Sequence, residues 1–188
     1  MPLLDGASVK VFDEPRGKCV KCGGPARVKL VYGNSWMCER HFVEHLRGKV
    51  KENLVKYGMA ARDEKLLLAV SGGKDSVSLM KLIDDVVPEL GVEVVAVHIN
   101  LGIGEFSERS LEAFRRACST AKNVMCVELD LKDLLGTYMP EIIRRSRRPA
   151  CSVCGLVRRY VLNAAGAALG VSSIATGHHM DDLLTYAI

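Results

Sequence analysis

Apolar residues along most of this chain alternate between short continuous runs and helical spacing. The runs at 65–70, 93–100, 124–129 and 172–176 have the length of strands. Helical patterns lie between and after them: about 75–86, 107–122, 139–146 and 155–169. Continuous apolar strands joined by crossover helices are typical of a parallel sheet that is covered on both faces. The pattern therefore predicts an α/β domain with a doubly wound parallel sheet.

The first forty residues follow neither pattern. They are rich in glycine, proline, cysteine and charge, and they predict a small metal-organised module rather than part of a sheet. Apolar residues then recur at helical spacing from Phe42 to Val55, and Gly58 suits the end of that helix. We therefore divide the chain into a zinc-binding module, 1–44, and an α/β domain, 45–188.

The last eight residues, 181–188, have the acidic start and apolar continuation of a further helix. An α/β domain rarely ends at such a point. We therefore expect the carboxyl-terminal part of the domain to be missing from this chain.

The composition is that of a globular protein. Hydrophobic residues make up 48% and charged residues 26%, and no apolar run approaches the roughly 18 residues of a membrane span. The amino-terminal residues lack the basic-then-apolar order of a signal peptide. We expect a soluble, cytoplasmic protein with no membrane partner. The net charge of +4 permits a polyanionic partner without requiring one.

A glycine-rich turn lies between the first strand and its helix, at Ser71-Gly72-Gly73-Lys74-Asp75-Ser76. A strand, such a turn and a helix place unpaired backbone N–H groups and the positive end of a helix at one point, which favours anion binding. The glycines let phosphate oxygens approach the backbone, the serines donate hydroxyl hydrogen bonds, and the lysine supplies a point charge.

This turn is not a Walker loop, which needs GxxxxGK[ST], because Asp75 follows the lysine. The pattern SGGKDS resembles the PP-loop of the N-type ATP pyrophosphatases. This resemblance implies cleavage of ATP between its α- and β-phosphates and transfer of AMP to a substrate oxygen.

Two further segments suit that chemistry. The end of the second strand, 97–100, lies where backbone groups at the carboxyl edge of the sheet can hold an adenine. The segment ATGHHMDD resembles the superfamily's TGHNxDD, with His179 where asparagine is usual. Asp181 and Asp182 at a helix start either hold Mg²⁺ or act as ordinary helix-dipole partners, and the motif favours Mg²⁺. His98 and His178 fit packing or hydrogen bonding better than catalysis.

Four soft ligands occur early in the chain as two knuckles. Cys19-x2-Cys22 is followed by Cys38-x2-His41, a spacing that predicts a closed tetrahedral zinc site of structural type. His45 is a substitute for His41, but the Cys-x2-His knuckle favours His41. Unmetallated thiols are the alternative.

A second cysteine pair, Cys151 and Cys154, lies within a basic stretch. By itself the pair fits half of a zinc site, a redox dithiol, or two ligands of an iron–sulfur cluster. The basic stretch fits a solvated face as well as nucleic-acid binding. The surrounding arginines are Arg144, Arg145, Arg147, Arg148, Arg158 and Arg159. Cys118 on a helix face and Cys126 in a strand predict small buried core residues.

The ordered motifs CVKC, CERH, ARDE, AVSGGKDS, CSVCG followed by RRY, and ATGHHMDD resemble one family, the tRNA 2-thiouridine synthetases of the TtuA type, from about residue 19 to the end. The resemblance implies a sulfurtransferase that adenylates the carbon-2 oxygen of a tRNA uridine and replaces that oxygen with sulfur. It also implies a 4Fe-4S cluster on the middle cysteine pair and a third cysteine, and a second zinc module. Neither that third cysteine nor that module is in this sequence.

Carried over residue by residue, the resemblance implies these roles. Cys151 and Cys154 hold the cluster, and Asp182 lies near Mg²⁺. Lys74, Asp75, Asp182 and Arg158 act in catalysis. ATP is bound by Ala69, Ser71, Gly72, Gly73, Lys74, Asp75, Ser76, Ile99, Arg158, Gly177 and Asp182. The implied partners are tRNA and a ubiquitin-like sulfur-carrier protein or other sulfide donor, and a homodimer is a candidate assembly.

Two other functions compete with thiolation. One is an adenylating amide ligase of the NAD- or GMP-synthetase kind, which leaves both cysteine sets unexplained. The other is a zinc-containing RNA- or protein-binding module without catalysis.

Overall fold

The computed structural model describes residues 9–59 and 64–178. The chain divides into two compact units, Met1–Val50 and Lys51–Ile188, and helix α1 (Glu39–Lys56) runs from the first into the second. Within the described residues, no helix is both long and apolar enough to cross a membrane.

The first unit contains two small antiparallel sheets. One has the order β1-β4-β5, and the other pairs β2 with β3. The bounds are β1 (Val9–Val11), β2 (Gly17–Lys18), β3 (Pro25–Ala26), β4 (Val28–Leu30) and β5 (Ser35–Met37). The expectation of a module without sheet was therefore wrong. Strands of two or three residues are too short to show an alternating pattern.

The second unit is built on a four-stranded parallel sheet, which confirms the predicted fold class. Its order is β8-β7-β6-β9. The strands are β6 (Lys65–Ala69), β7 (Glu93–Asn100), β8 (Val124–Asp130) and β9 (Ser173–Thr176). Successive strands are added on one side of β6 and then, with β9, on the other. In open parallel sheets a crevice for ligands forms at such a reversal, outside the carboxyl ends of the strands.

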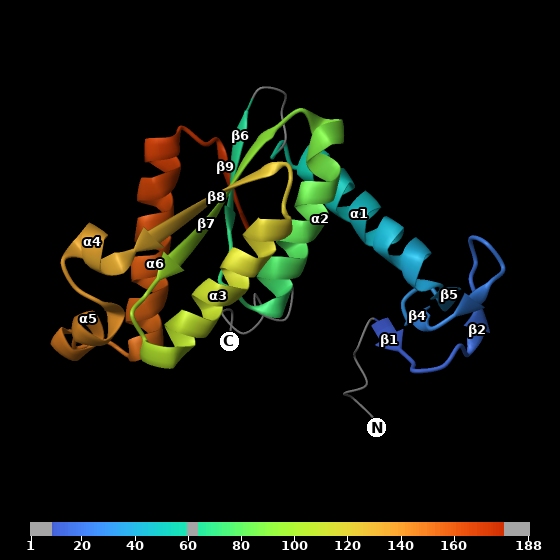
Figure 1. Cartoon of the computed structure of the whole chain (residues 1–188), viewed down its shortest axis with the longest axis horizontal. Helices are drawn as coiled ribbons and strands as arrows, with labels where there is room; N and C mark the ends of the chain where they lie inside the picture. The colour runs from blue at the N-terminus through green and yellow to red at the C-terminus, as the bar shows by residue number, and fades with distance from the viewer. Residues whose placement is uncertain (1–8, 60–63, 179–188) are drawn as a thin grey trace. The chain divides into compact units, whose positions relative to one another are not determined.

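Helices cover both faces of this sheet (Figure 1). They are α2 (Lys74–Leu90), α3 (Gly104–Thr120), α4 (Leu131–Leu135), α5 (Met139–Arg145) and α6 (Ala150–Leu169). On one face Leu67, Val95 and Val97 form a core with Leu162 and Ala165 of α6. On the opposite face the His98 ring stacks on Phe114 of α3, with 5.2 Å between ring centroids.

Two helices differ from the sequence prediction in ways that affect function. Helix α3 begins three residues before 107, and α6 begins at Ala150 instead of about 155. Cys151 and Cys154 therefore lie inside a helix. The short helix α4 was missed because it has only five residues; the Asp130 carboxylate caps its start by accepting from the Lys132 amide at 2.8 Å.

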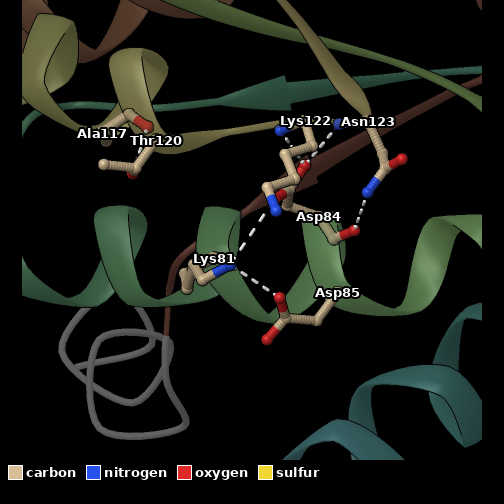
Figure 2. A network of polar contacts seen from close by, with 7 residues as sticks. All are labelled: Lys81, Asp84, Asp85, Ala117, Thr120, Lys122 and Asn123. Carbon is tan, nitrogen blue, oxygen red and sulfur yellow. Dashed lines mark hydrogen bonds and ion pairs between the residues drawn. The ribbon is translucent and has the colours of Figure 1, made fainter.

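A buried carboxylate joins α2 to the connection between α3 and β8 (Figure 2). Asp84 is 2% exposed, and its Oδ1 accepts from the amides of Lys122 at 2.9 Å and Asn123 at 2.7 Å. The Asn123 side chain donates back to the Asp84 carbonyl at 2.9 Å. Lys81 compensates the carboxylate charge from 3.5 Å. The Asp84 carboxylate thus satisfies two backbone N–H groups that follow the end of α3, and it fixes α2 against that end.

A disulfide joins the end of α3 to β8. It links Cys118 to Cys126, and both residues are only half-buried. The prediction that they are separate buried core residues was therefore wrong. The sequence shows a thiol on a helix and a thiol on a strand, but it does not show that the helix end lies beside that strand.

We predict that replacing both residues, Cys118→Ala with Cys126→Ala, lowers the free energy of unfolding by about 2–3 kcal/mol. The bond closes a short loop, and in the chain-entropy model a loop of this size restricts the unfolded state by that amount. Denaturant unfolding with and without a reductant measures the effect. The reductant should destabilise the wild type and leave the double variant unchanged. Equal stability of the oxidised wild type and the double variant would contradict the prediction.

Candidate nucleotide-binding site

The loop between β6 and α2 is held by its own hydrogen bonds. Ser76 Oγ donates to the Gly73 carbonyl at 3.0 Å, and the Ser71 amide donates to Ser76 Oγ at 3.2 Å. The helical ladder begins where the Val77 amide donates to the same carbonyl at 3.1 Å. The amides of residues 74–76 therefore precede the ladder and can bind a ligand. Together with the positive end of α2 they make an anion site.

Two glycines bring this loop into backbone contact with its neighbours. Gly72 has a φ of 82°, and a Cβ there would lie 2.3 Å from the carbonyl oxygen of Ser110 on α3. A Cβ on Gly177, just after β9, would lie 2.9 Å from the Cα of Ser76. The loop is thus fixed between α3 and the end of β9, and neither contact leaves room for a side chain.

A cavity of about 370 Å³ opens beside the loop at the carboxyl edge of the sheet. Eight of the eleven residues predicted to bind ATP line it: Ala69, Ser71, Gly73, Asp75, Ser76, Ile99, Arg158 and Gly177. Gly72 and Lys74 do not line it. Gly72 packs on α3, and the Lys74 ammonium donates to Asp75 at 2.7 Å. Asp182, and with it the predicted Mg²⁺ site, lies outside the described residues.

Sequence reasoning missed a second set of lining residues on α3 and α6. These are Phe106, Ser107, Ser110, Gly155 and Arg159. The two serines and the phenylalanine belong to no motif, and the sequence placed the start of α3 after Phe106. No local sequence pattern marks these residues as lining the cavity.

His98 supports the start of the phosphate loop from below. Its Nδ1–H donates to the carbonyl of Val70 at 2.8 Å, and the ring is 2% exposed. Burial lowers the pKa of His98, although the Val70 carbonyl opposes that change. The imidazole is therefore neutral near pH 7, with its proton on Nδ1. This geometry agrees with the packing and hydrogen-bonding role that the sequence predicts.

The segment that leads from β7 into α3 is also fixed. Asn100 donates to Asp130 on the neighbouring strand at 2.8 Å and accepts from the Gly102 amide at 3.1 Å. Gly102 has a φ of 67°, and a Cβ there would lie 2.2 Å from the Tyr138 ring. The wall of the cavity that α3 provides is therefore positioned by side chains from β7, from β8 and from Tyr138, the residue before α5.

Helix α6 carries both the cysteine pair and two cavity arginines. Cys151 and Cys154 are three residues apart in its first turn, so both thiols lie on one side of the helix. Cys151 is exposed, and Cys154 packs against the core around Met139. One to two turns later, Arg158 and Arg159 line the cavity.

The arginines near the cysteine pair fall into two classes, those with an acidic partner and those without one among the described residues. Arg144 and Arg145 both form ion pairs with Glu141. The guanidinium groups of four others form no ion pair or hydrogen bond within the described residues: Arg147, Arg148, Arg158 and Arg159. Uncompensated guanidinium groups in such number suit a polyanionic ligand.

The four predicted zinc ligands of the first unit come together. Ligand atoms of Cys19, Cys22, Cys38 and His41 all lie within 4.8 Å of one another. His41 Nδ1 is 3.3 Å from the Cys19 sulfur and 3.2 Å from the Cys38 sulfur. Burial opposes ionisation of the Cys19 thiol, but hydrogen bonds from backbone groups and His41 lower its pKa to about 6. Three sulfurs and one imidazole nitrogen form the donor set of a tetrahedral zinc site.

Residues 43–187 match the family model described as the PP-loop domain. The chain belongs to this family. Similar PP-loop proteins include two named tRNA-5-methyluridine(54) 2-sulfurtransferase. The protein from Pyrococcus horikoshii is 36% identical over 91% of this chain and 53% of its own length. The protein from Thermus thermophilus is 38% identical over 87% of this chain and 50% of its own. These names confirm the resemblance to the TtuA-type tRNA 2-thiouridine synthetases.

Solved structures are also similar to this chain. The U34-tRNA thiolase NcsA from Methanococcus maripaludis, solved with its [4Fe-4S] cluster, is 27% identical with a TM-score of 0.77. The match covers 89% of this chain and 55% of that one. An NH3-dependent NAD synthetase from Campylobacter jejuni, 18% identical with a TM-score of 0.50, shares the fold alone. This chain spans about half the length of the curated relatives it matches.

The two loop glycines differ in what an added methyl group would meet, and this difference predicts different effects of substitution. Gly72→Ala places a Cβ against the α3 backbone at a positive φ, so we expect loss of several kcal/mol of folding stability and of ATP binding. Gly73→Ala is the matched control for folding stability alone, because its Cβ would meet only Ser71 Oγ at 3.5 Å, although the residue lines the cavity. Thermal unfolding and calorimetric ATP titration measure both effects. Equal stability of the two variants would show that the contact with α3 is unimportant.

Proposed function

We propose that this chain acts in ATP-dependent tRNA thiolation, in the cytoplasm, by adenylating the carbon-2 oxygen of a uridine that then receives sulfur. The supporting observation is the arrangement of α6. This helix carries Cys151 and Cys154 in its first turn and then presents Arg158 and Arg159 to the cavity beside the phosphate loop. An amide ligase with a PP-loop leaves the exposed thiol of Cys151 beside Cys154 unexplained. The relatives named as tRNA sulfurtransferases point to the same reaction.

In this proposal ATP lies along the carboxyl edge of β6 and β7, with its adenine near Ile99 and its phosphates on residues 71–76. The uridine oxygen attacks the α-phosphate, the bond to the β-phosphate breaks, and pyrophosphate leaves. The loop amides would stabilise the charge that develops on the phosphates, and Lys74, which pairs with Asp75 in this structure, would turn toward them. Asp182 is the residue that would hold Mg²⁺, which would neutralise part of the same charge. Arg158 holds a permanent positive charge at the same cavity. Once the carbon-2 oxygen carries AMP, it becomes a good leaving group. Sulfide can then attack carbon 2 and displace AMP together with that oxygen.

The cysteine pair fits two corners of an iron–sulfur cluster. Both thiols are free, lie one turn apart, and sit at a helix start, where the positive helix end favours negative charge. When bound, a 4Fe-4S cluster with three cysteine ligands supplies an open iron that can hold sulfide. A sulfide donor, such as a ubiquitin-like carrier protein, would deliver the sulfur. Of the other cysteines here, two form the disulfide and three belong to the zinc cluster.

We propose that the arginines without an ion-pair partner among the described residues form a binding surface for tRNA. Each guanidinium that neutralises a backbone phosphate releases counterions, so tRNA binding should weaken steeply as salt rises. Arg147 and Arg148 precede α6, while Arg158 and Arg159 lie on it. We propose that the first pair binds the tRNA backbone and that the second pair lies nearer the reacting groups.

The test is tRNA-dependent formation of AMP and pyrophosphate, followed by mass spectrometry of the digested tRNA for 2-thiouridine in the presence of sulfide. We expect Arg158→Ala to lower AMP formation about 100-fold, as for loss of one group that stabilises transition-state charge. Arg116→Ala is the matched control, because Arg116 pairs with Glu112 on α3 and does not line the cavity.

Two results would contradict this proposal. If AMP formation is independent of tRNA but requires ammonia and a carboxylate acceptor, the protein is an amide ligase. Unchanged thiouridine at every tRNA position in a strain that lacks the gene would exclude thiolation.

Protein purified without oxygen should contain iron and sulfide in amounts that Cys151→Ser reduces.

We also propose that residues 1–44 form a structural zinc module. The supporting observation is the gathering of the four ligand atoms. His41 Nδ1 faces the cysteine sulfurs and would bind the metal, while its Nε2 lies 3.2 Å from an Arg40 guanidinium nitrogen and 3.7 Å from the Glu44 carboxylate. Zinc binding of about 10 kcal/mol or more can fold a module of such short strands.

We predict one zinc ion per chain and its loss in Cys38→Ser. Elemental analysis measures the zinc content, and the circular dichroism of the first unit should decrease as a chelator removes the metal. Cys151→Ser serves as the control, since its thiol lies outside the four-ligand cluster. Full zinc content in Cys38→Ser would exclude this ligand set.

A further inference from the structure

Phe106 is a large apolar residue of the cavity, and it has no role in the proposed binding of ATP. It lies in the first turn of α3 and lines the cavity, yet it is 60% exposed. Within the described residues its ring stacks on no other ring and lies under no cation. A phenyl ring that is exposed at a cavity wall leaves apolar area for a ligand to cover.

The position of this ring relative to the phosphate loop is fixed. Ser110, four residues further along α3, has its backbone against Gly72. The first turn is closed by Ser107, whose Oγ accepts from the Ile103 amide at 2.9 Å. Phe106 therefore belongs to a rigid wall that contacts the loop, and not to a mobile segment.

The chemistry around the ring is that of a single-stranded nucleic-acid site. Arg158 and Arg159 line the same cavity, and neither has an acidic partner within the described residues. An exposed aromatic ring in one cavity with guanidinium groups is an arrangement by which proteins hold unstacked bases and their phosphates. A uridine within folded tRNA must leave its stack before its carbon-2 oxygen can reach an α-phosphate.

We propose that Phe106 is the platform on which the extruded uracil of the tRNA substrate stacks. This inference rests on the proposed function. The same chemistry would also suit the adenine of ATP, but the proposed adenine site is the backbone at Ile99, and Ile99 is half-buried whereas Phe106 is 60% exposed. Phe106 positions the base by contact and takes part in no bond making.

The test is a cycle of two changes measured by tRNA binding. One change is Phe106→Ala. The other is an abasic site in place of the uridine that mass spectrometry identifies as thiolated. We expect each change alone to weaken tRNA binding about 5- to 150-fold relative to the wild-type protein with intact tRNA, which is the range for loss of one stacked base. In the Phe106→Ala protein the abasic substitution should have almost no further effect.

Three further variants define the contact. Phe106→Trp keeps the ring and should retain binding and the KM for tRNA within about 3-fold, whereas Phe106→Leu keeps apolar volume without the π-face and should behave as Phe106→Ala. Tyr57→Ala is the matched control, because Tyr57 is 66% exposed and does not line the cavity. The kcat at saturating tRNA should change less than the KM.

Each remaining outcome has a distinct meaning. If Phe106→Ala weakens ATP binding in the absence of tRNA, the ring stacks on adenine and the inference is wrong. If the wild type forms thiouridine and Phe106→Ala binds tRNA equally well, the inference alone is wrong. A wild type that forms neither AMP nor thiouridine with tRNA overturns the proposed function, and this inference with it.

Discussion

The nucleotide site depends on close backbone contact around one loop. Gly72 places the loop against the carbonyl of Ser110, and Gly177 places the end of β9 against Ser76. Both contacts exclude a side chain, so the segments meet at a distance that only glycine permits. The phosphate loop, the amino-terminal half of α3 and the carboxyl end of β9 consequently form one wall of the cavity.

Contacts further from the cavity stabilise the same arrangement. Asp84 ties α2 to the residues that follow α3, and the disulfide from Cys118 ties the end of α3 to β8. Asn100 and Asp130 fix the segment that precedes α3. Helix α3 is thus held at both ends and in its middle. Such repeated fixation suits a site in which reacting groups must be held in place.

The sequence was sufficient for the fold class and for most of the phosphate site. Continuous apolar strands and the SGGKDS turn have strong local signatures, because the strand length and the glycine positions follow directly from their geometry. The gathering of the four candidate metal ligands was equally readable, since both knuckles have fixed spacing. What could not be read were relations between distant segments. Neither the pairing of Cys118 with Cys126 nor the approach of Phe106 to the loop leaves a trace in either local pattern.

Helix starts were the other weak point, and here the error mattered. The segment that contains Cys151 and Cys154 is neither strongly apolar nor periodic, so the sequence placed the helix after it. In the structure α6 begins at Ala150, and the cysteines and Arg158 share one rigid element. Seven residues along an α-helix separate Cys151 from Arg158, a rise of about 10 Å and almost two full turns. The proposed cluster ligands and the cavity arginine are therefore spaced by the pitch of one rigid helix, so neither can approach the other without bending or unwinding α6.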